Sequence, residues 1–193
     1  AARWALEQTG HREAILDTPA GPRNTRVHED DSVTVGMGTP TFDPTEVPVD
    51  RDEPLIQESV GDVEITAVNT GVPHAVAFVD DVEGIDIEVA APPIRHAAVF
   101  PEGANATFAR RRSDGSFEQR TYERGVEGET QSCGTGAVAI VAVADRLGMT
   151  DGAEPTAVRP PGGTLTVTAA AGQEATLRGP TTFEIEGTFS FEP

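Results

Sequence analysis

A cysteine in a glycine-bearing turn is the residue whose type and setting point most directly to chemistry. Cys133 is the only cysteine of the chain, and Gly134, Thr135 and Gly136 follow it before an apolar run. If a helix begins here, its first turn offers unpaired backbone N–H groups and the positive end of the helix dipole. These features lower the pKa of a thiol and hold a carboxylate, so we expect an acidic thiol beside an anion-binding turn.

The same cysteine has a plainer interpretation. A free cysteine beside an apolar helix is often a small buried side chain without chemistry. The bare backbone of the Gly-Thr-Gly turn adds nothing to packing, although it lets a ligand approach closely. The residue types alone therefore leave both a reactive thiol and a core side chain open.

Periodicity predicts an α+β fold with many short strands and few helices. Apolar residues alternate in segments such as 63–71 and 164–169, which is typical of strands. The run 136–147 is long and apolar enough for a buried helix, and Gly148 is its natural stop. We also predict a helix ending near Gln8, a linker at 40–55, a strand at 85–90 and a hairpin turn at 113–115.

The charge balance excludes some classes of partner. The chain has 32 acidic residues against 14 basic ones, all arginine, for a net charge of -18. This balance argues against nucleic acids and anionic membranes as partners, and it is typical of proteins from salt-accumulating halophiles. No apolar run approaches the roughly 20 residues of a membrane helix, no signal peptide is evident, and a single cysteine forms no internal disulfide. We expect a folded cytoplasmic protein that low salt destabilises.

Several motifs occur in an order that resembles the diaminopimelate epimerase family. The segment 122–137, "YERGVEGETQSCGTGA", is similar to the family's second cysteine motif. Further matching stretches are "TPAGPR" at 18–23, "GVPHAV" at 71–76, "FPEGANATF" at 100–108 and "GPTTFEIEGTF" at 179–189. The resemblance covers essentially the whole chain.

The resemblance implies an enzyme without cofactor or metal that interconverts LL- and meso-diaminopimelate, a small-molecule substrate, in lysine biosynthesis. Two opposed cysteine thiols exchange the α-proton. The implied fold has two similar domains, each a strongly curved mixed sheet or barrel around a central helix. Residues 1–46, with a returning strand at 179–193, would be the remainder of an incomplete N-terminal domain, and 47–178 the C-terminal domain carrying Cys133.

The resemblance also assigns catalytic roles by position. Cys133 corresponds to the second catalytic thiol, and Glu123 and His74 support proton traffic at the thiols. Each supporting residue has an ordinary alternative: Glu123 with its neighbouring arginine could form a surface salt bridge, and a histidine after proline is often a satisfied loop residue.

Substrate-binding roles follow in the same way. The backbone of Gly134 and Thr135 would receive the α-carboxylate, Arg124 would anchor the distal carboxylate, and Asn105 and Glu123 would complete the binding residues. An asparagine before a strand is also common turn chemistry. The joint occurrence of these residues in the family's order favours the site.

Two departures affect the interpretation. Val72 stands where the family often has asparagine, and the family's first cysteine turn is absent. The first helix also lacks an N-cap residue. We therefore expect residues before Ala1 in the protein, and we expect the 193-residue chain to be inactive alone. The alternatives are a related cofactor-independent isomerase, of the proline racemase or phenazine-pathway type, or a non-catalytic carboxylate-binding domain. A homodimer is compatible with each.

Overall fold

The structure is a computed structural model that describes residues 2–184 and 187, and it has the predicted α+β composition. Its helices are α1 (Ala2–Thr9), α2 (Ile87–Arg95) and α3 (Gly134–Arg146). The strands in this part of the chain are β1 (Glu13–Leu16), β2 (Arg23–Val27), β3 (Val33–Gly38), β4 (Glu58–Val60), β5 (Val63–Asn69), β6 (Pro73–Phe78), β7 (Asn105–Arg111), β8 (Phe117–Glu123), β9 (Gly128–Glu129), β10 (Thr156–Arg159), β11 (Leu165–Thr168) and β12 (Ala175–Gly179).

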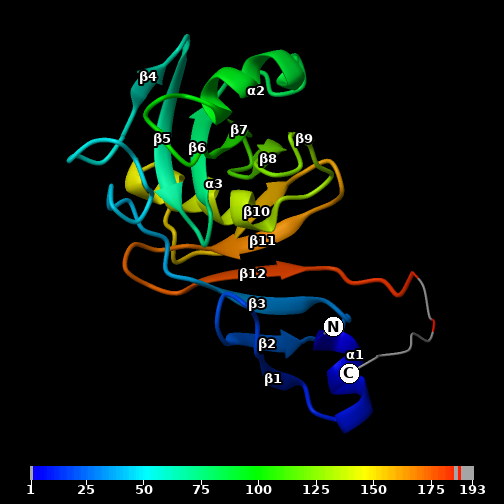
Figure 1. The fold of residues 1–193 in the computed structure, drawn as a ribbon. Helices are drawn as coiled ribbons and strands as arrows, with labels where there is room; N and C mark the ends of the chain where they lie inside the picture. The colour runs from blue at the N-terminus through cyan, green and yellow to red at the C-terminus, as the bar shows by residue number, and fades with distance from the viewer. Residues whose placement is uncertain (1, 185–186, 188–193) are drawn as a thin grey trace.

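The strands form one mixed sheet that curves around α3. The strand order is β1-β2-β3-β12-β11-β10-β8-β7-β6-β5-β4, with β9 beside β8. The pairs β6–β7 and β8–β10 are parallel, and the other pairs are antiparallel. Helix α3 contacts β5, β6, β7, β8, β11 and β12, so the sheet wraps around it (Figure 1). This arrangement confirms the predicted curved sheet around a central helix.

Helix α3 is apolar on every side because the sheet encloses it. Every residue from Gly136 to Ala144 is buried, as expected for a helix without a solvent-exposed face. The predicted helix is confirmed, although it begins two residues earlier, at Gly134. Gly148, with φ +69°, ends it as predicted, and its N–H donates to the Asp145 carbonyl at 3.0 Å.

Helix α2 covers the opposite face of the sheet, and the prediction of a strand at 85–90 is wrong. The alternation in that segment is short, whereas Ile87, Ala91 and Ile94 recur at helical spacing and are buried. They pack in a cluster with alternate residues of β5 and β6, while the intervening residues face α3. The burial of these helically spaced residues in the tertiary structure therefore decides the conformation of this segment.

The N-terminal part of the chain forms one end of the sheet. Helix α1 packs on β2, and its Ala2 and Leu6 form a small buried cluster with Val27 of β2 and Val33 of β3. The helix ends as predicted near Gln8, where the Gly10 N–H donates to the Leu6 carbonyl at 3.0 Å. None of the helices in the described residues has the length and hydropathy needed to cross a membrane.

Three connecting segments can be compared with the sequence-based predictions. The expected linker at 40–55 contains no helix or strand and joins β3 to β4, but it is packed, because Val47, Val49 and Leu55 are buried in the cluster beneath α2. The hairpin turn at 113–115 is confirmed between β7 and β8. The strand that returns to the N-terminal part is β12, which pairs with β3, whereas residues 180–184 form no strand. The rest of the predicted strand at 179–193 lies outside the described residues, except for Gly187.

Candidate active site

Cys133 is the N-cap residue of α3, as its sequence position predicts. Its backbone is extended, with φ −114° and ψ 101°, and its carbonyl accepts the first helical hydrogen bond from the Ala137 N–H at 3.0 Å. The side chain is 5% exposed, and its Sγ lies 3.4 Å from Thr135 Oγ1. The thiol therefore sits inside the protein at the start of the enclosed helix.

A buried glutamine on β8 fixes this turn. Gln119 Nε2 donates to the Cys133 carbonyl at 3.0 Å and to Thr121 Oγ1 at 3.1 Å. A Cβ atom at Gly136 would lie 2.7 Å from this amide nitrogen, so glycine is what lets the strand amide and the helix approach. Sequence reasoning missed Gln119 and Thr121, although with Glu123 they form an alternating polar row that signals one face of a strand.

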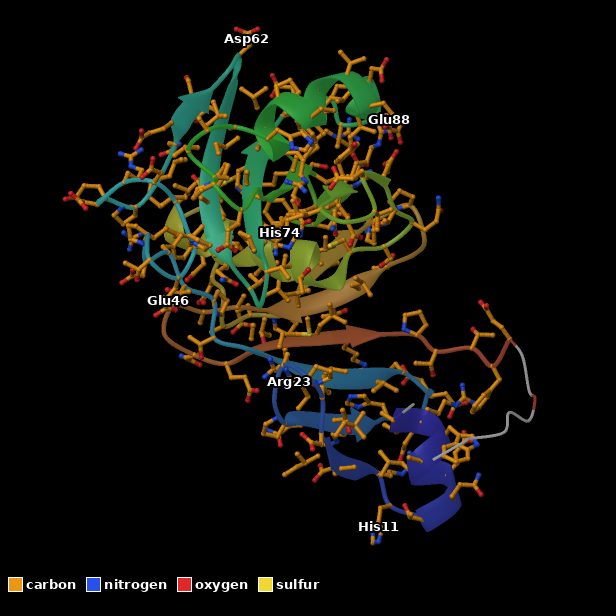
Figure 2. The ribbon with its side chains drawn as sticks, in the orientation of Figure 1. His11, Arg23, Glu46, Asp62, His74 and Glu88 are labelled. Atoms are coloured by element: carbon orange, nitrogen blue, oxygen red, sulfur yellow. The ribbon has the colours of Figure 1, made fainter. Side chains whose placement is uncertain are left out.

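His74 lies on β6 and is completely buried beside the same turn (Figure 2). Its Nδ1 is 3.0 Å from Thr107 Oγ1, and its Nε2 is 3.0 Å from Thr135 Oγ1. Asn105 Nδ2 lies 3.3 Å from the same Nε2. Burial, together with the positive charge of Arg124, lowers the pKa of His74 to about 3, so its imidazole is neutral at neutral pH.

Asn105 connects His74 to the backbone just after β8. Its Oδ1 accepts the Arg124 N–H at 2.7 Å, so the side chain bonds a residue far away in sequence rather than its own turn. The Arg124 guanidinium donates to the carbonyls of Glu102 and Gly103, at 3.0 and 3.4 Å. It forms no ion pair with a carboxylate of the described residues.

Glu123 does not pair with the adjacent arginine, so the surface salt bridge is the wrong alternative here. Its carboxylate accepts a hydrogen bond from Thr130 Oγ1. It also acts on Cys133, where its negative charge raises the pKa of the thiol. Glu123 is therefore close enough to the sulfur to influence its charge, and its role in proton exchange stays a prediction.

The prediction of an acidic thiol is wrong for this structure. Burial raises the pKa of Cys133 to about 11, and Glu123 adds to this rise. The Thr135 hydroxyl and the Gly136 N–H hydrogen-bond to the sulfur and lower the pKa, but by less than burial raises it. At neutral pH the group is a thiol, which is a proton donor rather than a base.

Most predicted site residues meet at the N-terminus of α3. Their side chains surround one turn and come from β6, β7, β8 and the helix itself; they are His74, Asn105, Glu123, Cys133 and Thr135. The other two predicted residues lie at the edge of this cluster. The Arg124 guanidinium lies on main-chain carbonyls, and Gly134 faces Leu177, whose Cδ1 is 3.2 Å from the position of a Gly134 Cβ.

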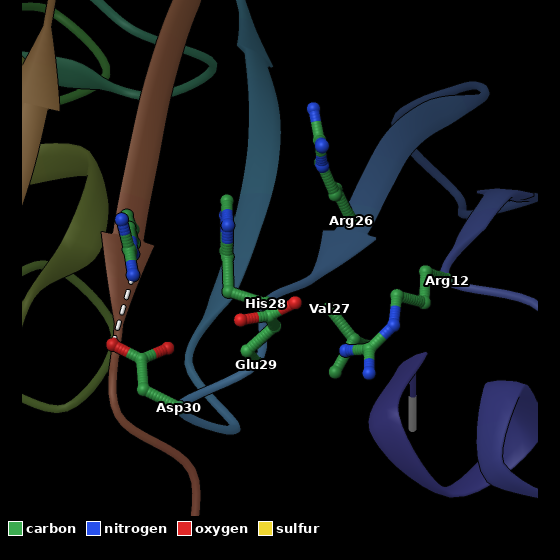
Figure 3. A pocket seen from close by; sticks show the side chains of 7 residues that line it. Arg12, Arg26, Val27, His28, Glu29 and Asp30 are labelled. Carbon is green, nitrogen blue, oxygen red and sulfur yellow. Dashed lines mark hydrogen bonds and ion pairs between the residues drawn. The ribbon is translucent and has the colours of Figure 1, made fainter.

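Several cavities lie outside this cluster. A groove of about 460 Å³ between α1 and the adjoining strands includes Leu177 in its wall, so it adjoins the Gly134 side of the turn. A second cavity, of about 490 Å³, is lined by charged side chains near the tip of β2 (Figure 3), where Arg178 pairs with Asp30 at 2.9 Å. None of the predicted site residues lines either cavity.

Solved structures share this fold. A hydroxyproline epimerase from Agrobacterium vitis matches with a TM-score of 0.59 and 21% identity, over 93% of this chain and 63% of that protein. A probable proline racemase from Agrobacterium radiobacter matches with a TM-score of 0.62 and 18% identity, over 96% of this chain and 64% of that protein. The chain has the fold of these epimerases and racemases.

Sequence comparison identifies a family within the proteins that share this fold. The family model described as "Diaminopimelate epimerase" matches residues 66–184. Proteins named diaminopimelate epimerase from Methanothrix thermoacetophila, Methanocella arvoryzae and Archaeoglobus fulgidus are 42%, 43% and 42% identical over 98%, 89% and 77% of this chain. The chain spans 66%, 61% and 54% of their lengths. It belongs to the diaminopimelate epimerase family.

The buried neutral state of His74 predicts a pH-dependent stability. Because its folded-state pKa of about 3 lies below the ordinary 6.5, the unfolded chain binds the proton first. Stability is therefore lost as the pH falls from 6.5 towards 3. Between pH 6.5 and 5, urea unfolding of the wild type should show a loss of about 2 kcal/mol that His74→Gln does not show.

The variant His11→Gln, at an exposed position, is the matched control and should keep the wild-type pH dependence. If His74→Gln loses as much stability as the wild type over this interval, His74 is not held neutral in the folded protein.

The contact between Gly136 and Gln119 predicts unequal effects of two alanine substitutions in the first turn of α3. Gly136→Ala displaces the Gln119 amide from two hydrogen bonds and should lower the free energy of unfolding by about 2 kcal/mol. In Gly134→Ala the new Cβ meets only the flexible end of Leu177, so the loss should be smaller. Equal losses in urea unfolding would contradict the role given to Gln119.

Proposed function

We propose that this chain provides one half of the active site of a diaminopimelate epimerase, with Cys133 as one of two acid/base groups. The observation that carries this proposal is the buried thiol at the N-cap of α3, beside the backbone of Gly134 and Thr135. The second group acts on the opposite face of the α-carbon. Since Cys133 is the only cysteine of the 193 residues, a second thiol would come from the part of the relatives' length that this chain does not span.

The helix N-terminus suits the α-carboxylate of the substrate. The α-proton of an amino acid is a very weak acid, so the negative charge that develops on its removal must be stabilised. The N–H groups of Gly134 and Thr135 have no acceptor among the described residues and lie at the positive end of α3. A carboxylate bound there would be held next to the sulfur.

Cys133 acts first as an acid in this proposal. With a pKa of about 11 it carries its proton at neutral pH, and it transfers that proton to the α-carbon as the opposite group removes the original one. The S–H bond breaks, the C–H bond forms, and the sulfur is left as a thiolate. In the reverse direction the Cys133 thiolate takes the α-proton while the opposite group returns one, and Glu123 is the nearby carboxylate that can first take the thiol proton to form that thiolate.

The distal end of the substrate would meet Arg124 and Asn105. The Arg124 guanidinium contacts carbonyls and no described carboxylate, so it is available for the distal carboxylate. Asn105 uses its Oδ1 for the Arg124 N–H and one amide hydrogen for His74, which leaves the other hydrogen for the substrate. Glu123 completes this side of the site.

We propose further that residues 1–46 belong to an N-terminal domain and residues 47–178 to the C-terminal domain. The small buried cluster of α1, β2 and β3 supports this division because it is separate from the two larger clusters. The net charge of -18 supports a cytoplasm rich in salt as the environment, and it argues against nucleic-acid partners. A homodimer is compatible with this proposal.

The proposed chemistry predicts solvent hydrogen at the α-carbon. In D2O and concentrated KCl, the full-length protein should convert LL-diaminopimelate to the meso form with one deuterium at the inverted carbon, because the thiol proton exchanges with solvent. Cys133→Ala should lower this rate by a factor of about 10² to 10⁴ or more. Mass spectrometry and chiral separation of the product measure both.

Val126→Ala, an exposed substitution between β8 and β9, is the control and should retain full activity. Turnover unaffected by Cys133→Ala would remove the thiol from the mechanism. Faster deuteration of proline or 4-hydroxyproline than of diaminopimelate would favour the related racemase class instead.

A further inference from the structure

A chain of hydrogen bonds fixes which nitrogen of His74 carries the proton. The Arg124 N–H can only donate, so the Asn105 atom that it contacts at 2.7 Å is the amide oxygen. The other end of the amide is then the NH₂ group, which donates to His74 Nε2 at 3.3 Å. Nε2 is therefore an acceptor, and the neutral ring carries its proton on Nδ1, which donates to Thr107 Oγ1 at 3.0 Å.

The fixed ring determines the hydrogen-bond directions at the Thr135 hydroxyl. Its Oγ1 is 3.0 Å from His74 Nε2 and 3.4 Å from Cys133 Sγ. Since Nε2 has no proton, Thr135 must donate to it, and the thiol S–H of Cys133 then donates to Thr135. When the sulfur loses its proton, the single hydroxyl hydrogen faces a thiolate and a ring nitrogen at once.

We propose that Thr135 is a positioning residue whose hydroxyl turns from His74 Nε2 to Cys133 Sγ when the thiol ionises. This rotation of the hydroxyl makes and breaks hydrogen bonds only. The proton lost from sulfur goes to the substrate carbon or to the Glu123 carboxylate. The catalytic meaning of this inference rests on the proposed function, whereas its physical content is the ionisation of Cys133.

Asn105 lowers the energetic cost of this rotation. An imidazole nitrogen without hydrogen has one lone pair, which Thr135 and Asn105 share in the thiol state. When Thr135 leaves, the Asn105 N–H remains, so no buried acceptor loses its last donor. The buried neutral histidine thus serves as a resting acceptor for the hydroxyl rather than as a base.

The charges around the first turn of α3 make the Thr135 hydroxyl important for stabilising the Cys133 thiolate. The titratable and charged groups of the described residues that face Cys133 and Thr135 are Glu123 from β8 and His74 from β6, and Arg124 acts on His74. Glu123 opposes the thiolate, and His74 is neutral. The donors to the sulfur are the Gly136 N–H and the Thr135 hydroxyl, of which only the hydroxyl belongs to a side chain.

Alkylation of Cys133 over a range of pH in the full-length protein tests the proposal, with the labelled peptide followed by mass spectrometry. Below the pKa, the rate is proportional to the thiolate fraction. Loss of a hydrogen bond to the charged form should raise the pKa by about one to two units, so Thr135→Val should alkylate about 10 to 100 times more slowly at each pH from 7 to 9. Thr135→Ser should restore the rate to within about threefold.

Thr70→Val is the matched control. Thr70 Oγ1 donates to the Thr135 carbonyl at 3.0 Å, so this variant removes a buried hydroxyl from the same turn without touching the sulfur. Its rate should stay within about threefold of the wild type. Equal rates for Thr135→Val and the wild type, or equal slowing by Thr70→Val, would overturn the proposal.

Nitrogen NMR of His74 provides a second readout that a structural role would not move. The Nδ1–H tautomer is expected in the wild type and in Thr135→Val, because Asn105 holds it in both. An Nε2–H tautomer would overturn the proposal, since that nitrogen would then be the donor to Thr135. If these results hold but diaminopimelate gains no deuterium, the proposed function fails and the hydroxyl rotation stands.

Discussion

The enclosure of α3 is the constraint on which the rest of the structure depends. Helix α3 is buried from Gly136 to Ala144, and Gly134 and Thr135 at its start are half-buried, so water has limited access to the unpaired N–H groups of the first turn. The unpaired groups at this end are N–H donors: the Gly136 N–H meets the Cys133 sulfur, and the N–H groups of Gly134 and Thr135 are left for a ligand. Gln119 and Thr70 add hydrogen bonds to the carbonyls of Cys133 and Thr135 and so hold the turn in place. The polar site is thus a consequence of how the apolar helix is packed.

The same burial determines the chemistry of the sulfur. Removal from water disfavours the thiolate more strongly than the helix end and two hydrogen bonds favour it, so Cys133 holds its proton at neutral pH. In the proposed mechanism, a protonated thiol next to the turn that would bind the α-carboxylate is suited to giving a proton to the adjacent carbon. Its return to the thiol form is then favourable, as the proposed role as an acid in each turnover requires.

The Cys133 turn and helix α3 were better predicted from the sequence than the hydrogen-bond network around them. Two glycines beside the single cysteine and an unbroken apolar run were sufficient to place Cys133 at a helix start. The strand predicted at 85–90 failed because three helically spaced apolar residues, ending with Ile94, outweigh a brief alternation. Gln119 and Thr107 were missed because a buried polar residue on a strand is recognised only when its partners, far away in sequence, are known. The predicted lowering of the thiol pKa was wrong for the same reason, since burial is a property of the tertiary structure.

The most direct test of this account is a titration of Cys133 in the full-length protein, followed by the ¹³Cβ chemical shift of a cysteine-labelled sample. The account predicts a thiol throughout the neutral range, with ionisation only as the pH approaches about 11. A thiolate already present at neutral pH, with a midpoint at or below the ordinary value of about 8.5, would contradict it.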